Sequence, residues 1–152
     1  MKRNKADRYL RVYEQLISLT GKTESEISRM ATINAVLHYK IDGFFWTGFY
    51  LINGDDLKVG PYQGPLACQV LEKNKGVCWT CINTGDRVII KNVNMFPGHI
   101  ACDPRSKSEI ALPLRNKIGK IVGVLDVDSK SENNFDEIDA DYLQKITDLV
   151  YR

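Results

Sequence analysis

Hydrophobic residues recur at helical spacing in the first forty positions. One run stops at Gly21, and a second follows Thr23 and Glu26, which have the spacing of a capping box. The apolar positions are Tyr9, Tyr13, Leu16 and Ile17 in the first run, and Ile27, Met30, Ala31 and Leu37 in the second. We therefore predict two amphipathic helices whose apolar faces pack against the core.

The middle of the chain has the pattern of strands. Residues 44–51 are mostly aromatic and end at Asn53-Gly54, a dipeptide typical of a tight hairpin turn. Residues 57–59 should return as the partner strand, and residues 87–90 form another short strand. The remaining elements are a short helix near 69–83, an irregular segment at 91–107, and strands at 109–114 and 118–127. Long irregular segments in compact domains are often functional.

The last element is a further helix. Asn134 is its predicted cap, with Glu137 three positions later. Its predicted buried face consists of Phe135, Ile138, Tyr142, Ile146 and Leu149. The order of elements predicts an α+β domain, in which helices pack on one side of a central antiparallel sheet.

Composition adds limits on the class of protein. The chain has 152 residues, 43% hydrophobic and 26% charged, as in an ordinary globular domain. Its net charge of +2 is too balanced for a nucleic-acid or membrane surface. The basic start lacks the apolar run of a signal peptide, and no stretch approaches the roughly 18 apolar residues of a spanning helix. We therefore expect one soluble, cytoplasmic domain over residues 1–152, with no nucleic-acid or membrane partner.

All four cysteines, Cys68, Cys78, Cys81 and Cys102, lie within a 35-residue stretch at 68–102. A structural disulfide framework is not expected in a cytosolic protein of this size. Inert burial, a metal site and redox chemistry remain, and the clustering argues against inert burial of all four.

Three hypotheses for the cysteines stay open on spacing alone. Cys78 and Cys81, together with His99 and Cys102, have a spacing that zinc accepts. Cys78 and Cys81 also have the C-x-x-C spacing of a thioredoxin-like dithiol, although the β-α-β context of that fold is missing. The third hypothesis is a cycle in which one thiolate attacks, becomes a sulfenic acid and is resolved by a second thiol.

Cys102 is the best candidate for the attacking thiolate. It lies in the irregular segment, where Pro97 and Gly98 favour an exposed bend. His99, if near, would favour the thiolate form.

Three carboxylates add to the third hypothesis. Asp126 and Asp128 are two positions apart on one predicted strand, so both point to the same face, and Glu109 begins the neighbouring strand. Crowded carboxylates raise one another's pKa, which would supply an acid near neutral pH, and together they could hold a substrate ammonium group. The alternative is a solvated strand face with no chemical role.

The chain resembles the free methionine-(R)-sulfoxide reductases, which are stand-alone GAF domains. The matching stretches are WTGFYL at 46–51, GPYQG at 60–64, AC at 67–68, GVC at 76–78, FPGHIACD at 96–103, SEI at 108–110, GVLDVDS at 123–129 and NFDE at 134–137. The resemblance implies a GAF-like fold with about six antiparallel strands flanked by helices, commonly paired as a homodimer. It implies reduction of free L-methionine-(R)-sulfoxide, with thioredoxin as reductant and with no cofactor or metal.

The resemblance also implies roles for individual residues. Cys102 would attack the sulfoxide sulfur, Cys68 would resolve the intermediate, and Cys78 would be an auxiliary thiol. The residues implied to bind substrate are Glu109, Asp126, Asp128, Trp46 and Tyr50.

One departure from the family pattern follows Cys78. Trp79-Thr80-Cys81 stands where glycine and small residues are usual, so Trp79 could narrow or cap the pocket and Cys81 is an additional thiol. The alternative function is that of a non-catalytic GAF module that binds a small molecule, because residues 133–137 resemble a motif of cyclic-nucleotide GAF domains.

Overall fold

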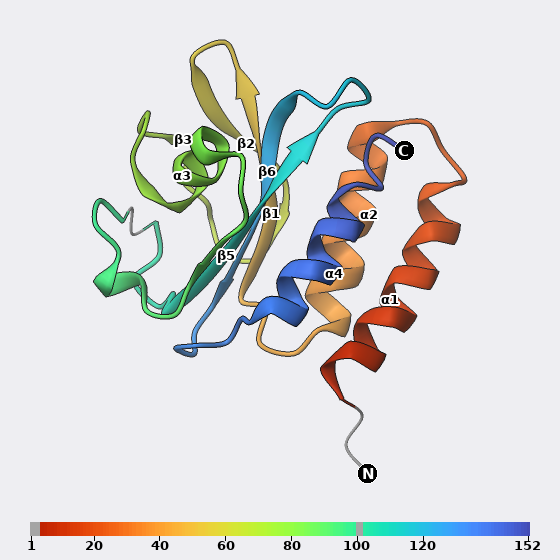
Figure 1. Ribbon diagram of the computed structural model, residues 1–152, viewed down its shortest axis with the longest axis horizontal. Coiled ribbons are helices and arrows are strands. Elements are labelled where there is room, and N and C mark those ends of the chain that lie inside the picture. Colours follow the sequence, from red (N-terminus) through yellow and green to blue (C-terminus); the bar gives the residue numbers. More distant parts are fainter. Residues whose placement is uncertain (1–3, 100–101) are drawn as a thin grey trace.

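A six-stranded antiparallel sheet with strand order β3-β2-β1-β6-β5-β4 forms the centre of the molecule (Figure 1). The computed structural model describes residues 4–99 and 102–152. The strands are β1 Trp46–Asn53, β2 Asp56–Gln63, β3 Val70–Leu71, β4 Val88–Ile90, β5 Ser108–Arg115 and β6 Ile121–Ser129. The predicted α+β class and six-stranded antiparallel sheet are confirmed.

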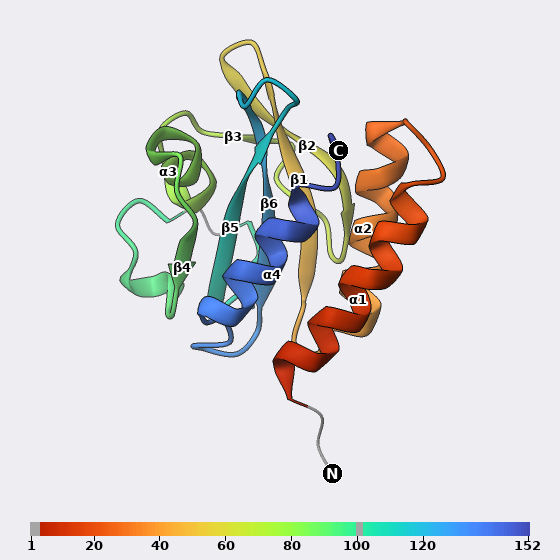
Figure 2. The ribbon, with the colours of Figure 1, turned by 45° about the vertical axis from the view of Figure 1, so that its right-hand side comes forward.

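The helices lie on both faces of the sheet, so the prediction of helices on one side is wrong. The helices are α1 Lys5–Thr20, α2 Glu26–Lys40, α3 Gly76–Thr84 and α4 Glu137–Thr147, with a 3-10 turn at Val93–Met95. Helices α1, α2 and α4 cover one face, and α3 lies against the other (Figures 1 and 2). Because α3 buries Val77, Trp79 and Cys81, it requires an apolar surface of its own.

Successive side chains of the central strands point to opposite faces of the sheet, and both faces carry apolar residues. Leu125 and Val127 of β6 belong to the main core, together with α1, α2 and α4. Val124 of β6 and Ala111 of β5 belong to a second apolar cluster, together with α3. Asp126 therefore lies on the α3 side, as the period of two in a strand predicts.

The hairpin predicted at Asn53-Gly54 is confirmed. Asn53 pairs with Asp56 across the turn, and Gly54 adopts a φ of 63°, which glycine tolerates without steric cost. The two-residue strand β3 was not predicted, because it is too short to show a period.

The start and the buried face of α2 differ from the prediction. Ser25 is the cap, and its side chain accepts a hydrogen bond from the Ser28 backbone N–H at 3.2 Å. The Thr23 hydroxyl instead accepts a hydrogen bond from the Ser25 backbone N–H. Ile27 is 68% exposed and Ala31 is also exposed, contrary to the predicted apolar face. The buried face consists of Arg29, Met30, Ile33, Asn34 and Leu37. In α1, Ile17 is likewise exposed.

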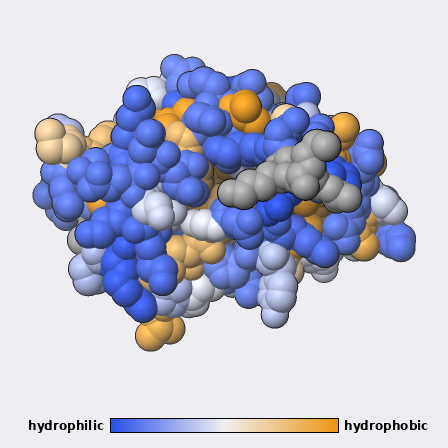
Figure 3. All heavy atoms as spheres, turned by 90° about the horizontal axis from the view of Figure 1, so that it is seen from below, coloured by the Kyte–Doolittle hydropathy of each residue, from blue (hydrophilic) through white to orange (hydrophobic). Residues whose placement is uncertain are grey.

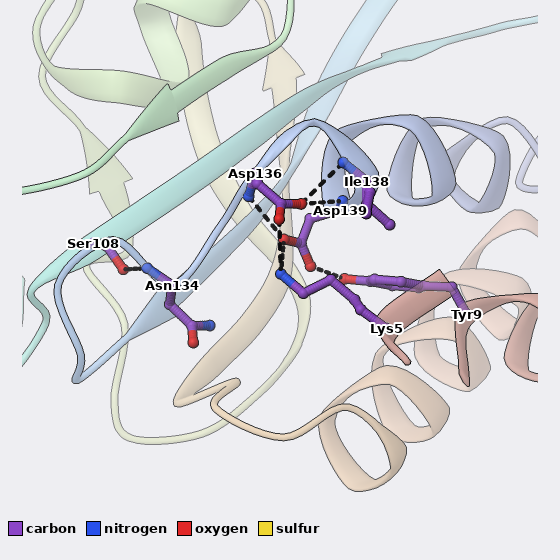
Figure 4. A network of polar contacts seen from close by, with 7 residues as sticks. All are labelled: Lys5, Tyr9, Ser108, Asn134, Asp136, Ile138 and Asp139. Carbon is purple, nitrogen blue, oxygen red and sulfur yellow. Dashed lines mark hydrogen bonds and ion pairs between the residues drawn. The ribbon is translucent and has the colours of Figure 1, made fainter. Parts of the chain in front are cut away.

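Asp136, not Asn134, caps α4 and fixes α1 against it (Figure 4). Asp136 and Asp139 form a reciprocal capping box. Asp139 also accepts hydrogen bonds from the Tyr9 hydroxyl and from Lys5 Nζ at 2.7 Å, both on α1. Ile138 is 41% exposed, contrary to the prediction, and Ala140 and Leu143 are buried.

The face seen in Figure 3 is mostly hydrophilic, with hydrophobic side chains scattered over it. Among the described residues, no helix combines the length and the apolar character that crossing a membrane requires.

Candidate functional site

One pocket on the α3 side of the sheet brings together most of the predicted site residues. Strands β1, β5 and β6, helix α3 and loop residues at 65–67, 99, 102–103 and 106 form its wall. The predicted residues that line it are Trp46, Tyr50, Cys78, Cys102, Glu109, Asp126 and Asp128. Cys68 is not part of the lining, but two lining residues are next to it: Ala67 precedes it in the chain, and Cys102 is bonded to it.

The three carboxylates converge because of the strand register. Glu109 of β5 pairs directly with Asp128 of β6, and Asp126 lies two residues along on the same face. Glu109 is 6% exposed and Asp126 is 4% exposed, and Asp128 is half-buried. The alternative of a solvated strand face is therefore wrong.

Burial and mutual repulsion favour the neutral form of these carboxyl groups. Burial is the main cause that raises the pKa of Glu109 well above its usual range, and the charges of Asp126 and Asp128 raise it further. Burial also raises the pKa of Asp126, and that of Asp128 well above its usual range, although Ser106 opposes the shift of Asp128 through a hydrogen bond. The pocket can therefore hold a protonated carboxylic acid near neutral pH.

Several polar atoms of this site have no partner within the described residues. Asp126 Oδ1 and His99 Nδ1 are buried without a hydrogen bond, and no described lysine or arginine forms an ion pair with Glu109, Asp126 or Asp128. His99 Nδ1 lies 3.9 Å from Glu109 Oε1, and burial lowers the pKa of the imidazole. Unpaired buried polar groups are costly, so the site suits a ligand that carries cationic or donor groups.

Aromatic rings form the opposite, apolar part of the pocket. The Trp46 ring stacks between Tyr50 and Tyr62, with ring centroids 5.6 and 5.3 Å away. Gly48 allows this packing, because a Cβ there would lie 2.5 Å from Trp46 Cη2. The Tyr50 hydroxyl donates a hydrogen bond to the Cys68 carbonyl at 3.2 Å, which links these aromatic residues to the loop that carries Cys68.

Cys68 and Cys102 form a disulfide with a Cα–Cα distance of 5.6 Å. The bond joins two loops that are 34 residues apart in sequence, at the rim of the pocket. With Cys102 bonded to Cys68, the zinc ligand set of Cys78, Cys81, His99 and Cys102 is not assembled. The disulfide agrees with a redox pair, as the sequence resemblance implies.

Cys78 and Cys81 are free, buried thiols in α3. Burial raises the pKa of Cys81 to about 12 and that of Cys78 well above its usual range, and nearby carboxylates raise both further. A thioredoxin-like dithiol requires an accessible thiol with a lowered pKa, and both of these thiols are buried, so the structure does not support that hypothesis. Trp79 does not cap the pocket: its indole N–H donates to the Leu71 carbonyl at 3.3 Å, and the ring packs under β3.

Some residues of the pocket were not predicted from the sequence. Ser106 lines it beside Asp128, and Phe45, Leu66 and Lys75 line it from loops. Loop residues have no periodic pattern to reveal them. The only available signal was their position next to predicted site residues in the chain.

Comparisons with known proteins agree with this site. The sequence model of the family described as GAF domain matches residues 31–150. GAF domain-containing protein A of Dictyostelium discoideum is 43% identical over 98% of this chain and 94% of its own. These matches make the chain a member of the GAF domain family.

Two reductases narrow the assignment. Free methionine-R-sulfoxide reductase of Escherichia coli (strain K12) is 36% identical over 94% of this chain and 86% of its own. The X-ray structure of free methionine-R-sulfoxide reductase from Neisseria meningitidis, in complex with its substrate, has a TM-score of 0.93 and 37% identity, covering 99% of this chain and 90% of that one. The chain belongs to the family of free methionine-R-sulfoxide reductases, which are oxidoreductases, and the resemblance seen in the sequence is confirmed.

Proposed function

We propose that this protein reduces free L-methionine-(R)-sulfoxide to L-methionine, with Cys102 as the attacking thiolate. The observation that carries the proposal is the Cys68–Cys102 pair at the rim of a pocket lined by three buried carboxyl groups. A pair within bonding distance can close a disulfide after one turnover. Its neighbours can protonate an oxygen and bind an ammonium group.

The reaction uses two thiols for each sulfoxide. The Cys102 thiolate attacks the sulfoxide sulfur, the oxygen is protonated and transferred to Cys102, and methionine leaves with the electron pair on sulfur. Cys102 is then a sulfenic acid. The Cys68 thiol attacks it, a disulfide forms and water leaves. An external dithiol, proposed to be thioredoxin, reduces the disulfide.

Glu109 is the proposed proton donor. Glu109 is buried and flanked by two further carboxyl groups, and both features raise its pKa. The protonated form is therefore favoured at neutral pH. General acids of this kind contribute about 10²–10⁴ in rate. Asp126 and Asp128 are the proposed partners of the substrate ammonium, and Trp46 and Tyr50 contact its methyl-sulfur end.

This division explains a preference for the free amino acid. A peptide bond would remove the ammonium charge and leave buried carboxyl oxygens unpaired, and sites built around such polar groups discriminate strongly. Cys78 lines the same pocket and is the proposed auxiliary thiol in disulfide exchange, acting after Cys102 and Cys68.

Cysteine variants test the assignment of roles. Cys102→Ser should abolish reduction, whereas Cys68→Ser should complete one turnover and stop without recycling. Cys81→Ala is the matched control, since Cys81 is buried outside the pocket lining, and it should retain multiple turnovers. The measurement is methionine released per chain after rapid quenching. Multiple turnovers by Cys102→Ser would sink the assignment.

Two further properties are proposals of the same kind: a cytoplasmic location and assembly as a homodimer. Analytical ultracentrifugation of the oxidised protein tests the dimer directly. A sedimentation coefficient of a 17.3 kDa monomer across the working concentration range would contradict it.

A further inference from the structure

We infer that the pocket binds one zinc ion per chain through Cys78, Glu109 and Asp126, and that zinc thereby blocks the substrate site. One ligand atom from each of these residues, the Cys78 sulfur and one carboxylate oxygen each from Glu109 and Asp126, lies within 4.8 Å of the other two. The three residues come from α3, β5 and β6, and all are buried. Three separate elements therefore hold one thiol and two carboxyl groups around a common point.

The donor set fits zinc better than other common cations. A soft sulfur ligand selects zinc over magnesium and calcium, which prefer oxygen alone. Ligand atoms around tetrahedral zinc are about 3.3–3.8 Å apart, given bond lengths of about 2.0–2.3 Å. The three ligand atoms are at most 4.8 Å apart, so bringing them to the zinc spacing requires side-chain shifts of about an ångström. Ordinary rotamer adjustment allows such shifts.

A second observation points to a ligand at this position. Asp126 Oδ1 is buried without a hydrogen-bond partner and lines the pocket, and His99 Nδ1 is likewise unpartnered beside Glu109. Among the described residues that line the pocket, Lys75 is the one lysine or arginine, and it forms an ion pair with Glu72. A divalent cation would satisfy the free oxygen, and His99, whose Nδ1 lies 3.9 Å from Glu109 Oε1, is the candidate for a fourth ligand.

This zinc site is distinct from the four-residue set predicted from spacing. Cys68 and Cys102 are bonded to each other and supply no ligand, so the oxidised protein should bind zinc. Zinc displaces the protons of the Cys78 thiol and of the Glu109 carboxyl to solvent, and no electron transfer is involved. Zinc would occupy Asp126, a proposed partner of the substrate ammonium, and Glu109, the proposed proton donor, so zinc and substrate should compete.

Zinc binding is measured on untagged, oxidised protein by equilibrium dialysis and elemental analysis, with zinc chloride as the probe. We expect one zinc per chain, no retention of magnesium, and displacement of zinc by excess free methionine sulfoxide. Loss of even an indirect partner of a metal ligand costs about 10–100-fold in affinity, so Cys78→Ala should weaken zinc binding by at least about tenfold. Asp126→Asn, which keeps the side-chain shape, should do the same. Cys81→Ala on the same helix should bind like the original chain.

Three results would overturn the inference: no zinc bound by the oxidised protein, unchanged affinity in both Cys78→Ala and Asp126→Asn, or zinc bound only after reduction of the disulfide. The last result would place the ligands on Cys68 and Cys102. The inference uses the same pocket as the proposed function, but its failure is separable. Turnover is assayed with a chelator present, whereas zinc binding is measured without turnover.

Discussion

Replacing Glu109 with glutamine should stabilise the folded protein at neutral and alkaline pH while changing little at acidic pH. Glu109 is buried, and it faces Asp126 and Asp128 from β6, Cys78 from α3 and His99 from the loop. Burial, followed by the two aspartate charges, raises its folded-state pKa well above the ordinary value of 4.5. The folded protein therefore retains a proton on this carboxyl at pH values where the unfolded chain has released it.

The sign follows from this difference in bound protons. A raised folded pKa contributes stability that is complete below the unfolded pKa and is lost as pH rises through the folded pKa. Glutamine has no proton to lose, so the variant avoids that loss. The free-energy advantage of Glu109→Gln should grow by about 1.4 kcal/mol per pH unit from about pH 4.5 upward, until the folded pKa is reached.

Thermal melts across a pH series provide the assay. For a domain of about 150 residues, 1 kcal/mol corresponds to about 2–4 °C, so the difference in Tm should grow by about 3–6 °C per pH unit. Both proteins are kept oxidised, so that the thiols of Cys68 and Cys102 do not titrate. Glu24→Gln is the matched control, because Glu24 is exposed, and its difference should stay within about 0.5 kcal/mol throughout. A flat difference between Glu109→Gln and the original chain would refute the account of a neutral, buried acid.

Two other substitutions test how the fold supports the site. Asp139→Ala should cost about 2–4 kcal/mol in thermal unfolding, since it removes the Asp139 half of the capping box and leaves the buried Tyr9 hydroxyl unpaired. Tyr9→Phe should cost less, because the capping box stays intact. A loss in the double variant smaller than the sum of the two single losses would confirm their coupling, and additive losses would contradict it. Gly48→Ala should lower the free energy of unfolding by about 1–3 kcal/mol in denaturant titration and should raise KM for the sulfoxide. The reason is that the new Cβ displaces the stacked rings of Trp46 and Tyr62. Unchanged stability would show that the rings adjust freely.

The elements that set the position of the carboxyl groups could be predicted from the sequence, because strands have a fixed period. Asp126 and Asp128 share a face by that rule, and Leu125 and Val127 mark the opposite face as core. The same rule cannot give the register between β5 and β6, which is what places Glu109 opposite Asp128. The sequence suggested that the three carboxyl groups meet, and the structure supplied the register that brings them together.

Helix starts were less predictable, because several residues near each start can cap. The caps of α2 and α4, Ser25 and Asp136, lie two residues later than the capping patterns suggested, and in both helices the buried face differs from the predicted one. The side of the sheet on which α3 packs was also missed. An apolar helix of nine residues has no single stripe, and only the second apolar face of the sheet determines where it lies.

The pairing of Cys68 with Cys102 could not follow from spacing, which left a zinc site and a C-x-x-C dithiol open. Two loops bring these residues together across 34 positions, whereas Cys78 and Cys81 are free, buried thiols in α3. The resemblance to the family supplied the pairing before the structure did.

The central claim is that this pocket recognises free methionine-(R)-sulfoxide and that Cys102 reduces it. Reduction of the free (R) form should be measured beside the (S) epimer and an N-blocked (R) form, in an assay coupled to thioredoxin and with a chelator present. The account predicts sustained turnover of the free (R) form, with loss of at least about 10²-fold for the blocked form, in which the buried carboxyl groups lose their partner. Equal turnover of the blocked form, or no turnover of any form, would contradict it.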